Sequence, residues 1–129
     1  MGSQDDYRIE DGEQFIRVAL RSHMAEGAEA DRLLRDVDSA LARTGFDRVM
    51  FDYRGVDGHG DEIREAMWTW AMDRSLRAVA LVVDGEMTRV RTNMTALSRK
   101  VRLRAFMNET EATQWMREPG RRTREIPQM

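Results

Sequence analysis

The most constraining feature of the sequence is a junction between a short apolar run and a helical pattern, from Val49 to Ile63. The apolar run 49–53 lacks the alternation of a half-exposed strand, so it predicts a central strand that is covered on both faces. A glycine-rich segment, 55–60, follows this strand, and a helical pattern begins near Asp61. In α/β domains such a junction lies at the carboxyl end of a strand, where ligands and partners usually dock.

Strand-like and helix-like patterns alternate along the rest of the chain. Strands are predicted over residues 7–10, 14–20, 49–53, 77–83 and 102–107, and helices over 26–43, 63–74, a segment after Asp84-Gly85 and a segment through Trp115-Met116. The pair Asp11-Gly12 between the first two strands is a hairpin signal, because glycine tolerates the positive φ that tight turns require. Strands separated by helices imply parallel pairs with right-handed crossovers. The order β-β-α-β-α-β-α-β-α therefore predicts one α/β domain, with four helices and a mixed, mostly parallel sheet of about five strands.

The helical periodicity also predicts which side chains face the core. In the third helix the inward residues are expected to be Met87, Val90, Met94 and Leu97. In the second helix Met67 and Trp70 lie on the predicted core face, whereas Trp68 and Met72 point roughly the other way. Two alternatives stay open for Trp68 and Met72: a neighbouring segment covers them, or they form a contact patch for another protein.

Composition narrows the class of protein. A chain of 129 residues, 41% hydrophobic and 34% charged, is expected to form one globular domain. No apolar run approaches the roughly 20 residues of a membrane span, and the acidic start lacks the features of a signal peptide. The absence of cysteine fits a cytoplasmic protein without disulfides. The domain is predicted over residues 7–117, with a flexible N-terminus at 1–6 and a disordered C-terminal tail at 118–129.

Charge is distributed unevenly along the chain. Residues 1–65 carry 16 acidic and 9 basic side chains, whereas residues 66–129 carry 7 acidic and 12 basic ones. No acid occurs from Met87 to Asn108, although this segment is rich in arginine. Because the net charge is only −2, nucleic-acid binding is not expected. The asymmetry points instead to a protein partner or to self-association as a homodimer.

The segment between the central strand and the second helix holds the candidate site residues Asp57, His59, Asp61 and Glu62. It matches neither of the common glycine-rich phosphate motifs, and its acids would repel a phosphate. Asp52, Asp57, His59 and Asp61 carry groups that ligate divalent metals, but their spacing fits no known ligand pattern. No metal and no cofactor is therefore predicted. No serine has the context of a catalytic nucleophile, so no catalytic residue is assigned.

Two segments resemble the STAS domain of anti-sigma-factor antagonists, especially the bacterial SpoIIAA-like group. The segment Phe51-Asp52-Tyr53-Arg54-Gly55-Val56 is similar to the family's pattern of a strand, Asp, two residues, Gly and a hydrophobic residue. The segment 104–116 is similar to the family's close: a strand into Phe, an acidic turn, Glu-Ala, two spacers, and Trp before a hydrophobic residue. The resemblance covers about residues 7–117 and implies a SpoIIAA-like fold with a role in bacterial signalling.

In switch-type members of this family, a serine in the loop before the second helix is phosphorylated by a partner kinase. The matching region here is Gly60-Asp61-Glu62-Ile63, and no serine or threonine occurs between Tyr53 and Thr69. The resemblance therefore implies that the serine switch is missing and that Asp61 stands at the equivalent position. Asp61 is interpreted first as a helix-capping acid, which the helix dipole favours by about 0.3–1 kcal/mol. A mimic of phosphoserine is the alternative.

Three functions remain open. The first is a non-enzymatic regulatory domain that binds another protein or itself, through Asp57, His59, Asp61, Glu62, Trp68 and Met72. The second is a binding module for a small apolar or lipid-like molecule, held between methionine-rich helices and the sheet. The third, ranked last, is a hydrolase that uses Asp52, His59 or Asp57.

Overall fold

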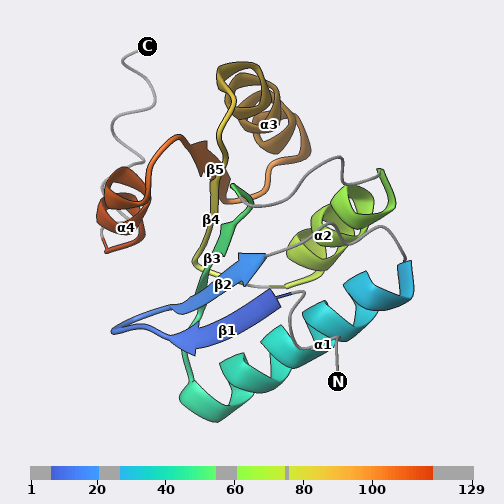
Figure 1. Cartoon of the computed structure of the whole chain (residues 1–129), viewed down its shortest axis with the longest axis vertical. Coiled ribbons are helices and arrows are strands. Elements are labelled where there is room, and N and C mark those ends of the chain that lie inside the picture. Colours follow the sequence, from blue (N-terminus) through green and yellow to red (C-terminus); the bar gives the residue numbers. More distant parts are fainter. Residues whose placement is uncertain (1–6, 21–26, 55–60, 75, 118–129) are drawn as a thin grey trace.

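The computed structural model describes residues 7–20, 27–54, 61–74 and 76–117, without the side chains of 27–29 and 61–64. Its strands and helices follow one another in the predicted order (Figure 1). They are β1 (Tyr7–Asp11), β2 (Ile16–Leu20), α1 (Gly27–Thr44), β3 (Arg48–Asp52), α2 (Asp61–Asp73), β4 (Ala78–Val82), α3 (Glu86–Arg99), β5 (Leu103–Phe106) and α4 (Glu109–Arg117). Each predicted element is present, with ends shifted by a residue or two.

The strands form one sheet in the order β1-β2-β3-β4-β5, so each strand pairs with its neighbours in sequence. The pair β1–β2 is antiparallel, and the pairs β2–β3, β3–β4 and β4–β5 are parallel. This confirms the predicted mixed, mostly parallel sheet. All of β4, and all of β3 after its first residue, are buried, as expected for apolar runs without alternation.

Local sequence signals fix the ends of two helices. Helix α1 is followed by Gly45, whose φ of 78° is the left-handed conformation that glycine adopts without strain. Asn108 caps α4, because its Oδ1 accepts a hydrogen bond from the backbone N of Glu111 at 2.9 Å.

Helices cover the sheet unequally (Figure 1). Helices α1 and α2 pack on one face, where their buried side chains join those of β2, β3 and β4 in the larger core. Helix α4 packs on the other face, where Ala112 and Met116 join a smaller core with side chains of β4 and β5. Helix α3 lies beside β5, at the edge of the sheet, and contributes Ala96 to the larger core. No helix in the described part of the chain is long and apolar enough to cross a membrane.

The predicted inward face of α3 is wrong. The four residues expected in the core are exposed: Met87 by 68%, Val90 by 38%, Met94 by 64% and Leu97 by 70%. Helix α3 is attached through another side, where Ala96 is buried and the side chain of Asn93 bonds to the backbone of Ala105 in β5. A helix beside a sheet edge contacts one strand rather than a whole face. Small and polar residues therefore suffice to attach it, and the apolar residues point outward.

Trp68 and Met72, for which the sequence leaves both burial and exposure open, differ in the structure. Trp68 is 5% exposed and belongs to the larger core, while Met72 is 55% exposed. The guanidinium carbon of Arg99, in the last turn of α3, lies 5.3 Å from the centre of a Trp68 ring. Of the two alternatives for Trp68, burial by neighbouring segments is the correct one, so its side chain is not an exposed contact residue.

Candidate functional site

The carboxylate of Asp52 is the centre of a polar cluster at the carboxyl end of β3. Asp52 is 8% exposed and is the only buried charged residue within the described part of the chain. Its Oδ1 accepts hydrogen bonds from the backbone N and the Nε of Arg54, at 3.1 and 2.9 Å. Its Oδ2 accepts hydrogen bonds from Nη2 of Arg54 at 2.8 Å and from Nη2 of Arg17 at 3.1 Å. A bidentate arginine–carboxylate pair therefore fixes the end of this strand.

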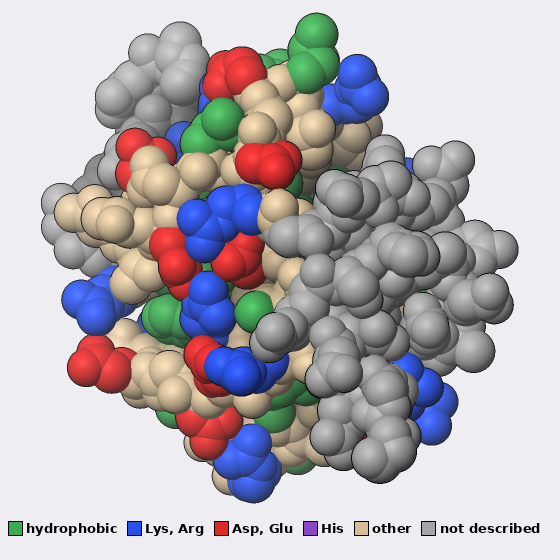
Figure 2. Space-filling view, viewed as in Figure 1, with side chains coloured by type: hydrophobic (Ala, Val, Ile, Leu, Met, Phe, Trp, Pro, Cys, Tyr) green, Lys and Arg blue, Asp and Glu red, His purple; other side chains and the backbone are tan. Residues whose placement is uncertain are grey.

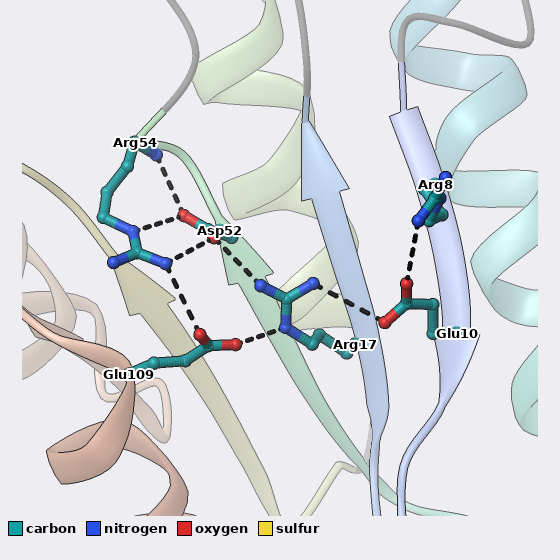
Figure 3. A network of polar contacts seen from close by, with 6 residues as sticks. All are labelled: Arg8, Glu10, Arg17, Asp52, Arg54 and Glu109. Atoms are coloured by element: carbon teal, nitrogen blue, oxygen red, sulfur yellow. Dashed lines mark hydrogen bonds and ion pairs between the residues drawn. The ribbon is translucent and has the colours of Figure 1, made fainter.

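Side chains from three other elements complete this Asp52 cluster, as Figure 3 shows. Glu109, in the first turn of α4, accepts a short hydrogen bond from Nε of Arg17 on β2 and one of 3.4 Å from Nη2 of Arg54. Glu10 on β1 lies 3.7 Å from Nη1 of Arg17, and Arg8 lies 3.5 Å from Glu10. Acidic and basic side chains accordingly alternate in the middle of Figure 2. The cluster ties β1, β2, β3 and α4 together.

Two opposing effects set the charge state of Asp52. Burial by itself would raise the pKa of Asp52, because it removes water from the carboxylate. Hydrogen bonds from the side chain and backbone of Arg54, together with the charges of Arg54 and Arg17, outweigh burial and hold the pKa of Asp52 below its ordinary value. Asp52 is therefore ionised at neutral pH.

The geometry suits a structural anchor better than a catalytic group. A general acid or base works best when its pKa lies near the working pH, and a nucleophilic carboxylate needs an oxygen that is free to attack. The pKa of Asp52 is lowered, and both of its oxygens accept hydrogen bonds from arginine. Asp52 instead fixes Arg54, the residue that directly precedes segment 55–60.

The predicted site residues are only partly described. Asp57 and His59 lie outside the described residues, as do the segments 1–6 and 118–129. Asp61 and Glu62 are the first residues of α2, in agreement with the predicted helix start, but their side chains also lie outside the description. Met72 lies near the other end of α2, about 16 Å from Asp61 along the helix axis. The binding role of these residues stays a prediction. Among the described residues, no group of three or more His, Asp or Glu side chains is placed to hold a metal ion.

Sequence reasoning does not find the partners of Asp52, which are Arg17, Arg54 and Glu109. Arg17 has the pattern of any polar residue in a half-exposed strand, and Glu109 has that of any first-turn acid. The alternation in β2 does predict that Arg17 points away from the larger core. What the sequence does not contain is the parallel register, which sets Arg17 beside Met50 and brings it within reach of Asp52.

A groove of about 940 Å³ between α1 and α2 bears on the hypothesis of an apolar ligand. Its lining includes the acids Asp31, Asp38, Glu65 and Asp73 and the largely buried side chains of Leu34 and Trp70. Asp38 accepts hydrogen bonds from Nε1 of Trp70 at 3.0 Å and from Nε and Nη2 of Arg74 at 3.0 and 2.6 Å. The exposed apolar side chains of α3 do not line this groove. A groove lined by ion pairs does not favour an apolar ligand.

Comparison with known proteins identifies the fold. No protein-family profile and no curated protein matches the sequence. An uncharacterized protein of the DUF3478 family with a SpoIIAA-like fold, from Shewanella loihica, is similar in structure with a TM-score of 0.64 and 16% identity, over 85% of this chain and 91% of that one. An anti-sigma factor antagonist from Mycobacterium paratuberculosis is similar with a TM-score of 0.65 and 16% identity, over 86% of this chain and 92% of that one. The chain thus has a SpoIIAA-like fold, as its two motif-like segments predicted.

Proposed function

We propose that this chain is a non-enzymatic regulatory domain of a bacterial signalling system, and that it acts in the cytoplasm by binding another protein. The observation that carries the proposal is the Asp52 cluster, in which an ionised carboxylate is held by two arginines at the carboxyl end of a central strand. Such a cluster fixes the end of the strand, and it provides no group whose pKa suits a general acid or base. The SpoIIAA-like fold supports the proposal, since one similar structure is that of an anti-sigma factor antagonist.

The proposed docking surface begins where the Asp52 cluster ends. It comprises Asp57, His59, Asp61 and Glu62, together with the exposed Met72 farther along α2. Three carboxylates in this short segment favour a partner with a basic surface, because complementary charge speeds and orients association. Trp68 is not part of this surface, because it is buried.

The proposal includes no phosphorylation of the domain at this surface. No serine or threonine occurs between Tyr53 and Thr69, and Asp61 is the first residue of α2. A carboxylate there interacts favourably with the positive end of the helix dipole at every pH above its pKa. We therefore propose a docking surface that phosphorylation does not switch, with Asp61 as a helix-capping acid. A permanent mimic of phosphoserine is the alternative.

Removal of the negative charges tests the docking surface. The triple variant Asp57→Asn/Asp61→Asn/Glu62→Gln is compared with the wild type in quantitative affinity capture from a lysate of the source bacterium. We expect the captured partner to bind the variant about tenfold more weakly, because the complementary charges are lost.

A matched control removes three acids at other exposed positions: Glu13→Gln/Asp47→Asn/Glu111→Gln. It should capture the same proteins as the wild type. Equal binding of the partner to both triple variants would contradict the proposed surface. Hydrolysis of a substrate by the pure wild-type chain, lost in Asp52→Asn, would contradict a non-enzymatic function.

A further inference from the structure

Helix α3 carries an apolar stripe that nothing in the described part of the chain covers. The stripe consists of Met87, Val90, Met94 and Leu97, which are exposed by 68%, 38%, 64% and 70%. Hydrophobic side chains are visible at the top of Figure 2, where α3 lies in Figure 1. Single exposed apolar residues are ordinary, but an aligned row on one helix indicates a contact surface.

The spacing of the stripe is that of a coiled-coil seam. The four residues follow one another at intervals of three, four and three, so Met87 and Met94 fall at heptad position a and Val90 and Leu97 at position d. Such a seam fits the side of a second helix, whose side chains insert between its own. Helix α3 contacts the rest of the domain through other residues, Ala96 and Asn93. The natural occupant of the stripe is therefore another helix.

The charges beside the seam point to the same helix of a second copy. Glu86 and Asn93 fall at position g, and Arg91 and Ser98 at position e. In a parallel pair, position g faces position e of the other helix five residues farther on, so each Glu86 would meet Arg91 of the second copy. In an antiparallel pair position e faces position e, which would bring the two Arg91 side chains together. Glu86 is available for this contact, because its present partner Arg89 holds it in an exposed pair within the same helix.

We propose that two copies of this chain associate through α3, packed in parallel along the stripe and flanked by two Glu86–Arg91 ion pairs. This inference rests on α3 alone and does not depend on the docking surface proposed above. The stripe consists of four residues, whereas a standard interface has about 20–30 residues on each side. A standard interface buries roughly 800 Å² on each partner. The expected dimer is therefore weak, forms at micromolar or higher concentration, and weakens with salt.

Sedimentation velocity over a concentration series tests the pairing. The wild type should shift from monomer to dimer as its concentration rises. Met94→Asp should raise the dissociation constant at least about tenfold, because an unpaired carboxylate would enter the seam. Thr88→Asp, on an exposed part of α3 away from the stripe, is the matched control and should associate like the wild type. Circular dichroism of each variant confirms that the fold is intact.

A charge exchange tests the parallel orientation. Glu86→Arg alone and Arg91→Glu alone should each weaken association a few fold, because each places like charges together. An equimolar mixture of the two variants should associate as strongly as the wild type, because both ion pairs are restored in the mixed dimer. No recovery in the mixture would overturn the parallel pairing.

The proposal fails if the wild type stays monomeric up to millimolar concentration, or if Met94→Asp dimerises as the wild type does. A monomeric wild type that sediments with anionic lipid vesicles, and loses this property in Met94→Asp, would assign the stripe to a membrane surface instead. Binding of an acidic amphipathic peptide to a monomeric wild type would assign it to another protein. Either result would overturn pairing with a second copy.

Discussion

Helices α2 and α3 have similar amphipathic sequences but are buried to very different extents. Trp68, on the predicted outer side of α2, is 5% exposed, whereas Leu97, on the predicted inner side of α3, is 70% exposed. Helix α2 lies over a face of the sheet, with α1 on one side and the end of α3 near Trp68. Helix α3 lies beside the edge strand and meets the domain on one side only. The place of a helix relative to the sheet therefore decides which of its apolar residues are buried.

The largest expected difference between the two helices concerns stability. Trp68→Ala should lower the free energy of unfolding by about 3–5 kcal/mol, because it removes a buried indole and leaves a cavity. Met94→Ala should change it by less than about 0.5 kcal/mol, because this side chain is exposed in the monomer. Urea denaturation of both variants in dilute solution measures the difference. Similar losses for the two variants would break the comparison.

The hydrogen bond that attaches α3 to the edge strand β5 should make an intermediate contribution to the free energy of unfolding. The backbone N of Ala105 donates a hydrogen bond to Oδ1 of Asn93 at 2.7 Å, and Ala105 is buried. Asn93→Ala should therefore lower the free energy of unfolding by about 2 kcal/mol, because a buried donor loses its acceptor. Hydrogen exchange at the Ala105 amide should also become faster, because this amide then lacks its hydrogen-bond acceptor. Ser98→Ala, at an exposed position of the same helix, serves as the control. An unchanged exchange rate in Asn93→Ala would show that α3 is held by other contacts.

The contact of Asp38 on α1 with Trp70 and Arg74 should contribute less to the free energy of unfolding, and its contribution should depend on pH. Hydrogen bonds from Arg74, and with them a hydrogen bond from Trp70, hold the pKa of Asp38 below its ordinary value despite partial burial. A lowered pKa in the folded state means that this stabilisation is complete above the unfolded pKa, about 3.9, and is lost as the pH falls through the folded pKa. Asp38→Asn should cost about 1 kcal/mol at neutral pH, since solvent screens the partly exposed pair.

Denaturation at neutral and at strongly acidic pH checks this effect. The difference between Asp38→Asn and the wild type should vanish at acidic pH, where the carboxyl group is protonated in both folded and unfolded chains. Asp73→Asn removes a more exposed carboxylate 3.7 Å from Arg74 and should change stability much less. A difference for Asp38→Asn that persists in acid would mean that the charge of Asp38 does not contribute.

Element types and their order could be predicted from the sequence, because they depend on local signals. The unbroken apolar runs of β3 and β4 and the cap at Gly45 all lie within a few residues of the structures they specify. The predicted hairpin is also present, but Asp11 ends β1, the loop spans residues 12–15, and Gly12 does not adopt the positive φ that was expected of it. The two sequence segments similar to STAS domains also predicted the fold that the solved structures show.

The orientation of α3 and the partners of Asp52 could not be predicted, because both depend on contacts between distant segments. Periodicity identifies an apolar stripe on a helix but does not say whether the stripe meets a sheet or solvent. Likewise, Asp52 was recognisable at a strand end, but Glu109 lies far along the chain and reaches the cluster only because α4 packs across the sheet. The docking residues Asp57 and His59 remain predictions.

The agreement between strand order in the sheet and strand order in the chain has a consequence for biosynthesis. Each strand from β2 onward pairs with the strand made just before it, so no strand must wait for a distant partner or be inserted between two others. A chain that emerges from the ribosome N-terminus first can therefore extend its sheet one strand at a time. At every stage the newest strand forms the growing edge of the sheet, while β1 remains the other edge. When β5 is added as the last one, Asn93 has already been synthesised and is ready to bond to its outer edge.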